Sequence, residues 1–151
     1  MQPSLANTHT SNSASNIFNS REYSPSSNVE NLVILIPNEG HHGPGKEDEA
    51  RFIAQSFVPE TAIIGEGTNV IWFNGDVGHE HDIVVMNNTD GTVPIYQTGK
   101  FTEFEARNYT FNEAGEFHYA DTVEYENSYI MRGNISITED DVGDSNELLQ
   151  Q

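Results

Sequence analysis

Short apolar runs separated by turn residues dominate the middle of the chain. Each run has four to seven residues, is rich in β-branched or aromatic side chains, and stops at Pro, Gly or a polar turn. Runs of this length suit half-buried strands, whereas an amphipathic helix needs a longer stretch, so the pattern predicts an all-β protein, an antiparallel Greek-key β-sandwich. A helical turn is indicated only at residues 47–54. The expected strands are residues 31–36, 52–58, 61–64, 69–73, 82–86, 101–104, 107–111, 117–120 and 133–137.

The two ends of the chain have a different composition from this middle part. Residues 1–28 are polar and rich in Ser and Asn, and residues 140–151 are acidic. Such segments bury too little apolar surface to offset the entropy lost on ordering. We therefore expect a flexible tail at 1–28, one folded domain at 29–139 and an acidic C-terminal tail at 140–151. The core of the folded domain should contain the aromatic residues Trp72, Phe73, Phe111 and Phe117.

Charge narrows the choice of partners. The chain has 24 acidic residues against six Lys and Arg, a formal net charge of −18. Nucleic-acid binders need clustered basic charge, and anionic membrane surfaces attract it too, so neither partner is expected. The longest apolar run, residues 32–36, is strand-sized, and direct membrane insertion is not expected either.

The chain contains no cysteine, which removes disulfides, thiolate ligands and thiol catalysis together. It also has no Gly-x-Ser-x-Gly turn and no Gly-rich phosphate loop before a helix. These absences disfavour an enzyme, and we assign no catalytic residue.

Two stretches of the chain have a distinctive order of motifs. Residues 67–76 (GTNVIWFNGD) lead into 78–84 (GHEHDIV), and residues 115–121 (GEFHYAD) precede 130–135 (IMRGNI). In this order and wording the chain resembles the cupredoxins, the family of blue-copper domains. The resemblance covers about residues 57–137, roughly half of the chain. It implies a β-sandwich whose ligand loops gather at one end.

The resemblance also implies four ligand positions. The first His of the family corresponds to His81, and the axial Met corresponds to Met131. Where the family has its Cys and its second His, this chain has Asp121 and Glu124. Without the thiolate a blue centre is excluded, and imidazole with carboxylate suits Cu(II), Zn(II), Mn(II) or Fe(II) instead. Alternatively, Met131 could be a core residue that fills space without binding a metal.

Further histidines lie near the same end of the expected sandwich. His79 and His81 are two residues apart, so on a strand both would point to one face. His41 and His42 lie in a Gly-rich loop after residues 31–36. In the cupredoxin topology this strand runs parallel to residues 69–73, which would bring both loops together. These histidines could also be merely solvated, or could surround a relic site. His118 alternates with Phe117 and Tyr119 and should face away from them.

Two functions are compatible with these features. The first is metal binding at a non-blue site of His and carboxylate ligands, with Cu(II) as the preferred ion. Such a site would serve to hold the metal, to deliver it or to act as a redox centre with a protein partner. The second is a surface interaction module, either metal-free or stabilised by a metal. Three glycosylation sequons, at residues 87–89, 108–110 and 134–136, indicate an extracellular or periplasm-type cell-surface location, with anchoring through a segment outside the given chain.

Overall fold

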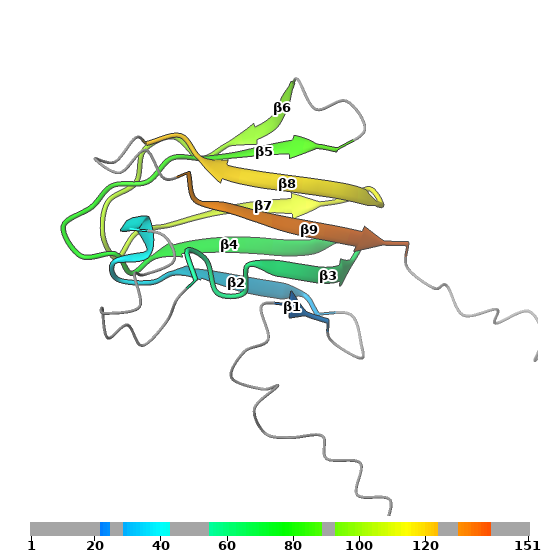
Figure 1. The fold of residues 1–151 in the computed structure, drawn as a ribbon. Coiled ribbons are helices and arrows are strands. Elements are labelled where there is room, and N and C mark those ends of the chain that lie inside the picture. Colours follow the sequence, from blue (N-terminus) through cyan, green and yellow to red (C-terminus); the bar gives the residue numbers. More distant parts are fainter. Residues whose placement is uncertain (1–21, 25–28, 43–54, 89–92, 124–129, 140–151) are drawn as a thin grey trace, which may run out of the picture.

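The computed structural model describes residues 22–24, 29–42, 55–88, 93–123 and 130–139. These residues form an all-β sandwich of two sheets with one short 3₁₀ helix, η1 (Gly40–His42) (Figure 1). The all-β sandwich predicted from the sequence is confirmed. The strands are β1 (Glu22–Tyr23), β2 (Asn31–Ile36), β3 (Thr61–Gly65), β4 (Thr68–Asn74), β5 (Ile83–Asn87), β6 (Pro94–Gln97), β7 (Ala106–Phe111), β8 (Gly115–Asp121) and β9 (Arg132–Thr138).

One sheet has six strands in the order β1-β3-β9-β8-β5-β6, and the other has three in the order β2-β4-β7. The pairing is mixed. Strands β1 and β3, β3 and β9, and β2 and β4 run parallel, while the remaining neighbours are antiparallel. The predicted parallel pairing of residues 31–36, now β2, with the strand that carries Trp72, now β4, is confirmed. Ile34 lies opposite Trp72.

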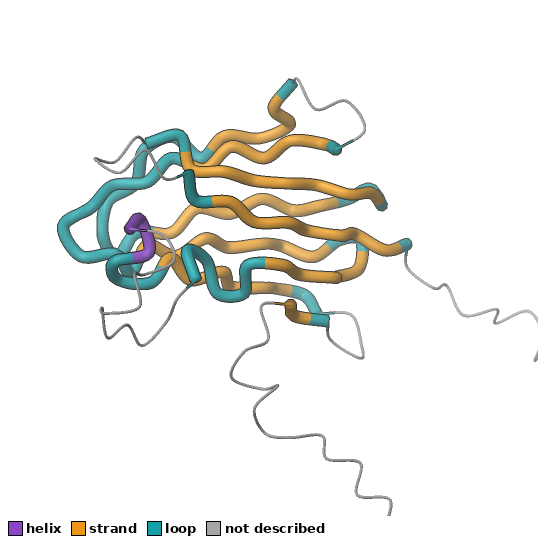
Figure 2. Tube along the Cα trace, in the orientation of Figure 1, coloured by secondary structure: helices purple, strands orange, loops and turns teal. Residues whose placement is uncertain are grey.

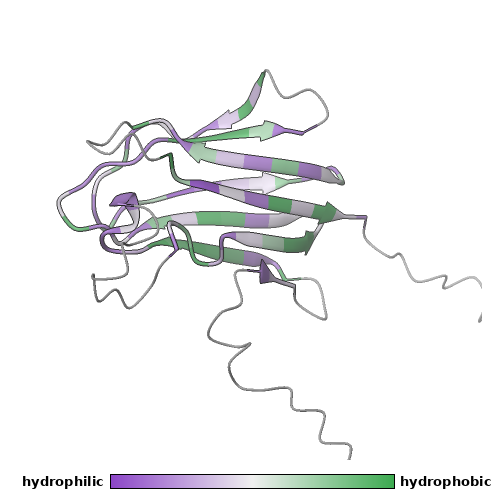
Figure 3. Ribbon diagram, viewed as in Figure 1, coloured by the Kyte–Doolittle hydropathy of each residue, from purple (hydrophilic) through white to green (hydrophobic). Residues whose placement is uncertain are grey.

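Alternate residues of the strands fill the space between the sheets. In β4 the side chains of Val70 and Trp72 are fully buried, and their neighbours are partly exposed. This alternation appears as changing colours along the strands in Figure 3. Trp72, Phe111 and Phe117 lie in the core as predicted. Phe73 does not, because strand parity places it on the other face of β4.

Some predicted strands are wrong or incomplete. Phe101 makes only an isolated bridge with His81, and residues 102–104 form no strand, because the chain turns there. Of the predicted strand at 52–58, residues 52–54 lie outside the described residues, and Val58 makes a single bridge with Leu35. Strand β6 was not predicted, since its opening Pro94 is typical of an edge strand rather than a central one.

The predicted domain boundaries are only partly visible. Glu22 and Tyr23, which the prediction assigned to the flexible tail, form β1 and pair with Thr61 and Ala62. The rest of the predicted tails and the helical turn at 47–54 lie outside the described residues, so these boundaries stay predictions. Among the described residues, no helix is long and apolar enough to cross a membrane.

Candidate metal centre

Parallel pairing of β2 and β4 brings two His-bearing loops to one end of the sandwich. Ile36 and Asn74 are the last paired residues, and the Gly75 N–H donates to the Ile36 carbonyl at 2.9 Å. A Cβ at Gly75 would lie 3.0 Å from that carbonyl, so a glycine permits this close approach. Beyond it, η1 and the loop between β4 and β5 lie together at the left of Figure 1, among the loops drawn teal in Figure 2.

The carboxylate of Asp76 is at the centre of this region and is fully buried. Its Oδ1 accepts the Glu39 N–H at 2.8 Å. Its Oδ2 lies 2.6 Å from His41 Nδ1 and 3.1 Å from His81 Nε2. Burial alone would raise the pKa of Asp76, but the hydrogen bonds from His81, Glu39 and His41 outweigh it, so the pKa is lowered. Asp76 is therefore an anion held by several donors.

The His81 imidazole contacts a carboxylate at each of its two nitrogens. Besides its contact with Asp76, its Nδ1 lies 2.5 Å from Asp121 Oδ2. The His81 side chain is fully buried. Burial alone would lower the pKa of His81, but the hydrogen bonds with Asp121 and Asp76 outweigh it and raise the pKa. The two carboxylates thus favour the imidazolium form.

Asp121 is held by the backbone around it. Its Oδ1 accepts the Asp82 N–H at 3.1 Å and the Val123 N–H at 3.0 Å. It lies at the end of β8, opposite Ile83 of β5. Asp121, His81, Asp76 and His41 consequently form an unbroken chain of alternating carboxylates and imidazoles.

Closer to the surface, the His41 ring lies between two other imidazoles. Its centroid is 4.0 Å from that of His42 and 3.8 Å from that of His79. His42 Nε2 lies 2.7 Å from Glu39 Oε2, and His79 Nδ1 lies 3.6 Å from Asp76 Oδ1. Burial lowers the pKa of His41, although Asp76 opposes this effect, so the neutral ring is favoured.

Two groups of three side chains in this region could each hold a metal ion. One is Glu39, His41 and His42, and the other is His41, Asp76 and His79. Within each group, the ligand atoms all lie within 4.8 Å of one another. We call the second group the outer group and the pair His81–Asp121 the inner pair. The loop end of the sandwich thus contains a His/Asp cluster that could bind a metal ion.

The structure brings most of the predicted site residues together. His41, His42, His79, His81 and Asp121 lie at this end of the sandwich, linked by the contacts above. Met131 is buried in the hydrophobic core, and its carbonyl accepts the Asp121 N–H at 3.0 Å. Glu124 lies outside the described residues.

Sequence reasoning missed two carboxylates of the cluster, Asp76 and Glu39. The available signal was their spacing, since Asp76 is three residues before His79 and Glu39 is two before His41. His118 alternates with the buried Phe117 and Tyr119 as predicted, and its Nδ1 contacts the Asn88 side chain instead of the cluster.

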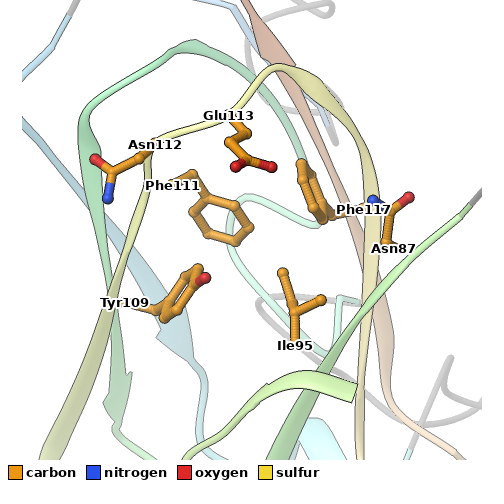
Figure 4. A pocket seen from close by; sticks show the side chains of 7 residues that line it. All are labelled: Asn87, Ile95, Tyr109, Phe111, Asn112, Glu113 and Phe117. Atoms are coloured by element: carbon orange, nitrogen blue, oxygen red, sulfur yellow. The ribbon is translucent and has the colours of Figure 1, made fainter. Parts of the chain in front are cut away.

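A cavity of about 260 Å³ lies elsewhere, beside the turn between β7 and β8 (Figure 4). Its described lining contains one carboxylate and no histidine, so it does not match the metal-binding chemistry of the loop end. The lining residues are Asn87, Ile95, Tyr109, Phe111, Asn112, Glu113 and Phe117.

Comparison with solved structures identifies the fold as cupredoxin-like. No protein-family model matches the sequence, and no curated protein matches it. Rusticyanin from Thiobacillus ferrooxidans is similar at a TM-score of 0.53 and 16% identity, over 79% of this chain and 83% of that chain. A purple cupredoxin from Nitrosopumilus maritimus is similar at 0.50 and 18% identity, over 70% and 98%. Auracyanin from Roseiflexus castenholzii is similar at 0.50 and 14% identity, over 74% and 99%.

Proposed function

Starting from a cupredoxin fold without any cysteine, we propose that this protein binds a divalent metal ion in a non-blue site of histidine and carboxylate ligands. The observation that carries this proposal is the outer group, in which His41, Asp76 and His79 offer three ligand atoms within 4.8 Å of one another. It lies at the end of the sandwich where the cupredoxin resemblance implies that the ligand loops gather.

The donor chemistry of the outer group fits Cu(II) best and Zn(II) second. Two imidazoles and a carboxylate suit both ions, and divalent copper has the higher intrinsic affinity for such nitrogen-rich sites. His42 and Glu39 lie next to this group and could supply further ligand atoms. A copper ion held here would lack a thiolate bond, because the chain has no cysteine, and would not be blue.

The role we propose is metal binding and delivery, with a redox or surface protein as the partner, outside the cytoplasm. Both the copper preference and the location rest on the sequence arguments and on the cupredoxin fold.

A second candidate function is a surface interaction module that needs no metal. The observation in its favour is that protein groups already surround the carboxylates of Asp76 and Asp121 at hydrogen-bond distance. Asp76 has three such contacts, with the Glu39 N–H and with ring nitrogens of His41 and His81. Asp121 accepts two backbone N–H groups. Such a network could be stable as a structural feature of the loop end.

A copper titration separates the two functions. The purified chain is stripped of metal, titrated with Cu(II), dialysed, and the retained copper per chain is counted while EPR records the nitrogen hyperfine splitting. The metal-binding proposal expects one retained copper with splitting from imidazole nitrogens. It expects His79→Ala to lose copper and His118→Ala, a histidine away from the cluster, to retain it. A wild-type chain that retains no divalent metal, copper or zinc, would instead favour the interaction module.

A further inference from the structure

We infer that the cavity beside the turn between β7 and β8 binds a small organic cation, an alkylated ammonium ion, which three aromatic rings and the carboxylate of Glu113 recognise. The cavity lies at the opposite end of the sandwich from the histidine cluster. Phe117, which lines it, is near the start of β8, whereas Asp121 of the cluster is the last residue of that strand. The inference is therefore independent of the proposed metal binding.

The cavity is present because the two sheets part at this side of the sandwich. Strand β6 is the edge strand of one sheet and β7 is the edge strand of the other, and the two do not pair with each other. Ile95 of β6 lines the cavity together with Tyr109 and Phe111 of β7. The volume of about 260 Å³ is just below the range of about 300 to 1,000 Å³ of pockets for drug-sized ligands. It suits a smaller molecule.

Three aromatic rings form walls of this cavity. The ring centroid of Phe111 lies 5.0 Å from that of Tyr109 and 5.1 Å from that of Phe117. The ring planes of these pairs are inclined by 85° and 61°, so the rings surround a space instead of forming a flat stack (Figure 4). The face of an aromatic ring attracts a cation within about 6 Å of its centroid. One ammonium group in the cavity can therefore interact with more than one ring.

Packing holds these rings in place before any ligand arrives. Tyr109 stacks on Tyr96 of β6 with the centroids 4.8 Å apart, and Tyr96 in turn stacks on the buried Trp72 at 6.2 Å. Phe111 and Phe117 belong to the hydrophobic core. Side chains that are already ordered lose little conformational freedom on binding, and this favours affinity for a small ligand.

The charge of the cavity also favours a cation. Glu113 is the one charged residue of its described lining, and Figure 4 shows the Glu113 carboxylate at the rim, beside Phe111 and Phe117. This carboxylate forms no ion pair or hydrogen bond with another described residue. The net charge of −18 concentrates cations around the whole chain. The lining and its surroundings are thus complementary to a positive ligand.

The mixture of rings and one carboxylate selects the kind of cation. A metal ion would find a single carboxylate and no histidine in the described lining, too few strong ligands to hold it. A neutral apolar molecule would make no use of the charge of Glu113. An ammonium ion with methyl or other alkyl groups fits both parts, because its apolar surface contacts Ile95 and the rings while its charge faces the carboxylate and the ring faces.

Choline and its neutral carbon isostere, 3,3-dimethylbutan-1-ol, test the inference on the wild-type chain. The two probes have the same shape and differ in charge, and each is titrated while backbone and aromatic NMR signals are recorded. We expect choline to shift the signals of the cavity lining and to bind about 2- to 30-fold more tightly than the isostere, the factor that corresponds to one cation–π contact. Sodium chloride at the same concentrations controls for ionic strength.

Three results of this titration would overturn the inference. Equal affinities for the two probes would remove the preference for a cation. Choline shifts that sodium chloride reproduces would indicate attraction to the acidic surface alone. The absence of choline shifts at the lining would remove the site itself.

Variants identify the groups that recognise the charge. Glu113→Gln should weaken choline binding by up to about 5-fold, the limit for a contact with an exposed carboxylate, and should leave binding of the isostere unchanged. Glu80→Gln removes the same charge at the other end of the sandwich and should bind choline as the wild type does. Tyr109→Leu keeps an apolar side chain without the ring, so it should weaken choline binding more than isostere binding.

The variants can also contradict the inference. A Glu113→Gln chain that binds choline as tightly as the Glu80→Gln chain would exclude the carboxylate from the site. Equal losses for both probes in Tyr109→Leu would exclude recognition of the charge by the ring. Neither result would affect the copper titration, because no histidine is changed.

Discussion

His81 Nδ1 and Asp121 Oδ2 face each other at 2.5 Å in the buried loop end of the sandwich. These are the positions at which the cupredoxin resemblance implies a histidine and a cysteine ligand. In this chain the two side chains bind each other. A carboxylate that accepts a hydrogen bond from a buried imidazole forms a short, charge-assisted contact of this kind.

Replacing Asp76 with Asn should destabilise the folded chain. The substitution removes the charge that His41 and His81 contact, and breaking a buried ion pair on one side costs about 3 kcal/mol or more. Urea denaturation of the metal-free protein measures the change in the free energy of unfolding. Glu80→Gln is the control, because Glu80 pairs with Lys100 on the surface and such pairs contribute less than about 1 kcal/mol. Equal effects of the two substitutions would contradict the central role of Asp76.

The stability of the metal-free chain should depend on pH through His81. Its pKa is raised on folding, so the stabilisation is fully present below about pH 6.5 and is lost as the pH rises through the folded pKa. The pKa of His41 is lowered, so His41 is neutral in both states above about pH 6.5 and adds no slope there. The stability difference between wild type and His81→Gln should shrink as the pH rises above about 6.5 and through the raised pKa of the folded state. A difference that stays constant over this range would rule out the raised pKa.

Metal affinity should fall when the pH drops below the ordinary imidazole pKa of about 6.5, because protons compete for the ring nitrogens. For His41 the competition should begin at lower pH, since burial lowers its pKa. Competition with a chromophoric chelator at a series of pH values measures this dependence. Affinity that is unchanged down to about pH 5 would indicate a site of carboxylates alone.

Met131→Leu should leave metal affinity unchanged. Met131 is 1% exposed and packs in the hydrophobic core, so a volume-conserving substitution should lower the free energy of unfolding by less than about 1.5 kcal/mol. Copper binding and denaturation of the same variant give both quantities. A marked loss of copper affinity in a well-folded Met131→Leu chain would show that the thioether is a ligand after all.

Gly133→Ala should destabilise the fold. A Cβ at this position of β9 would lie 2.7 Å from the Glu60 carbonyl and would overlap the ring of Tyr119, which is fully buried. Overpacking of this kind costs about 1–3 kcal/mol, measurable as a lower midpoint in urea. Asn134→Ala at the next, exposed position is the matched control and should change stability little. A Gly133→Ala chain as stable as this control would contradict the tight packing.

Local patterns in the sequence were enough for most of the fold. Alternating apolar residues identified the strands around Ile34, Trp72, Phe111 and Ile135, because a strand with one buried face imposes a period of two. They failed where pairing partners come from far along the chain. Tyr23 joins the sheet through Ala62, and Phe101 only bridges His81, and neither contact leaves a signature in the neighbouring residues.

For the site, residue types and spacing predicted that His41, His42, His79 and His81 would gather at one end, since parallel strands end on the same side of a sheet. The roles of these residues depend on contacts of 2.5 to 2.6 Å between side chains that are 35 to 40 residues apart in the sequence. Such distances follow from the packing of β2, β4, β5 and β8 together. The packing places Asp76 between His41 and His81 and joins His81 to Asp121. Because these contacts cross between loops far apart in the sequence, the inner pair and the outer group can be distinguished only in the tertiary structure.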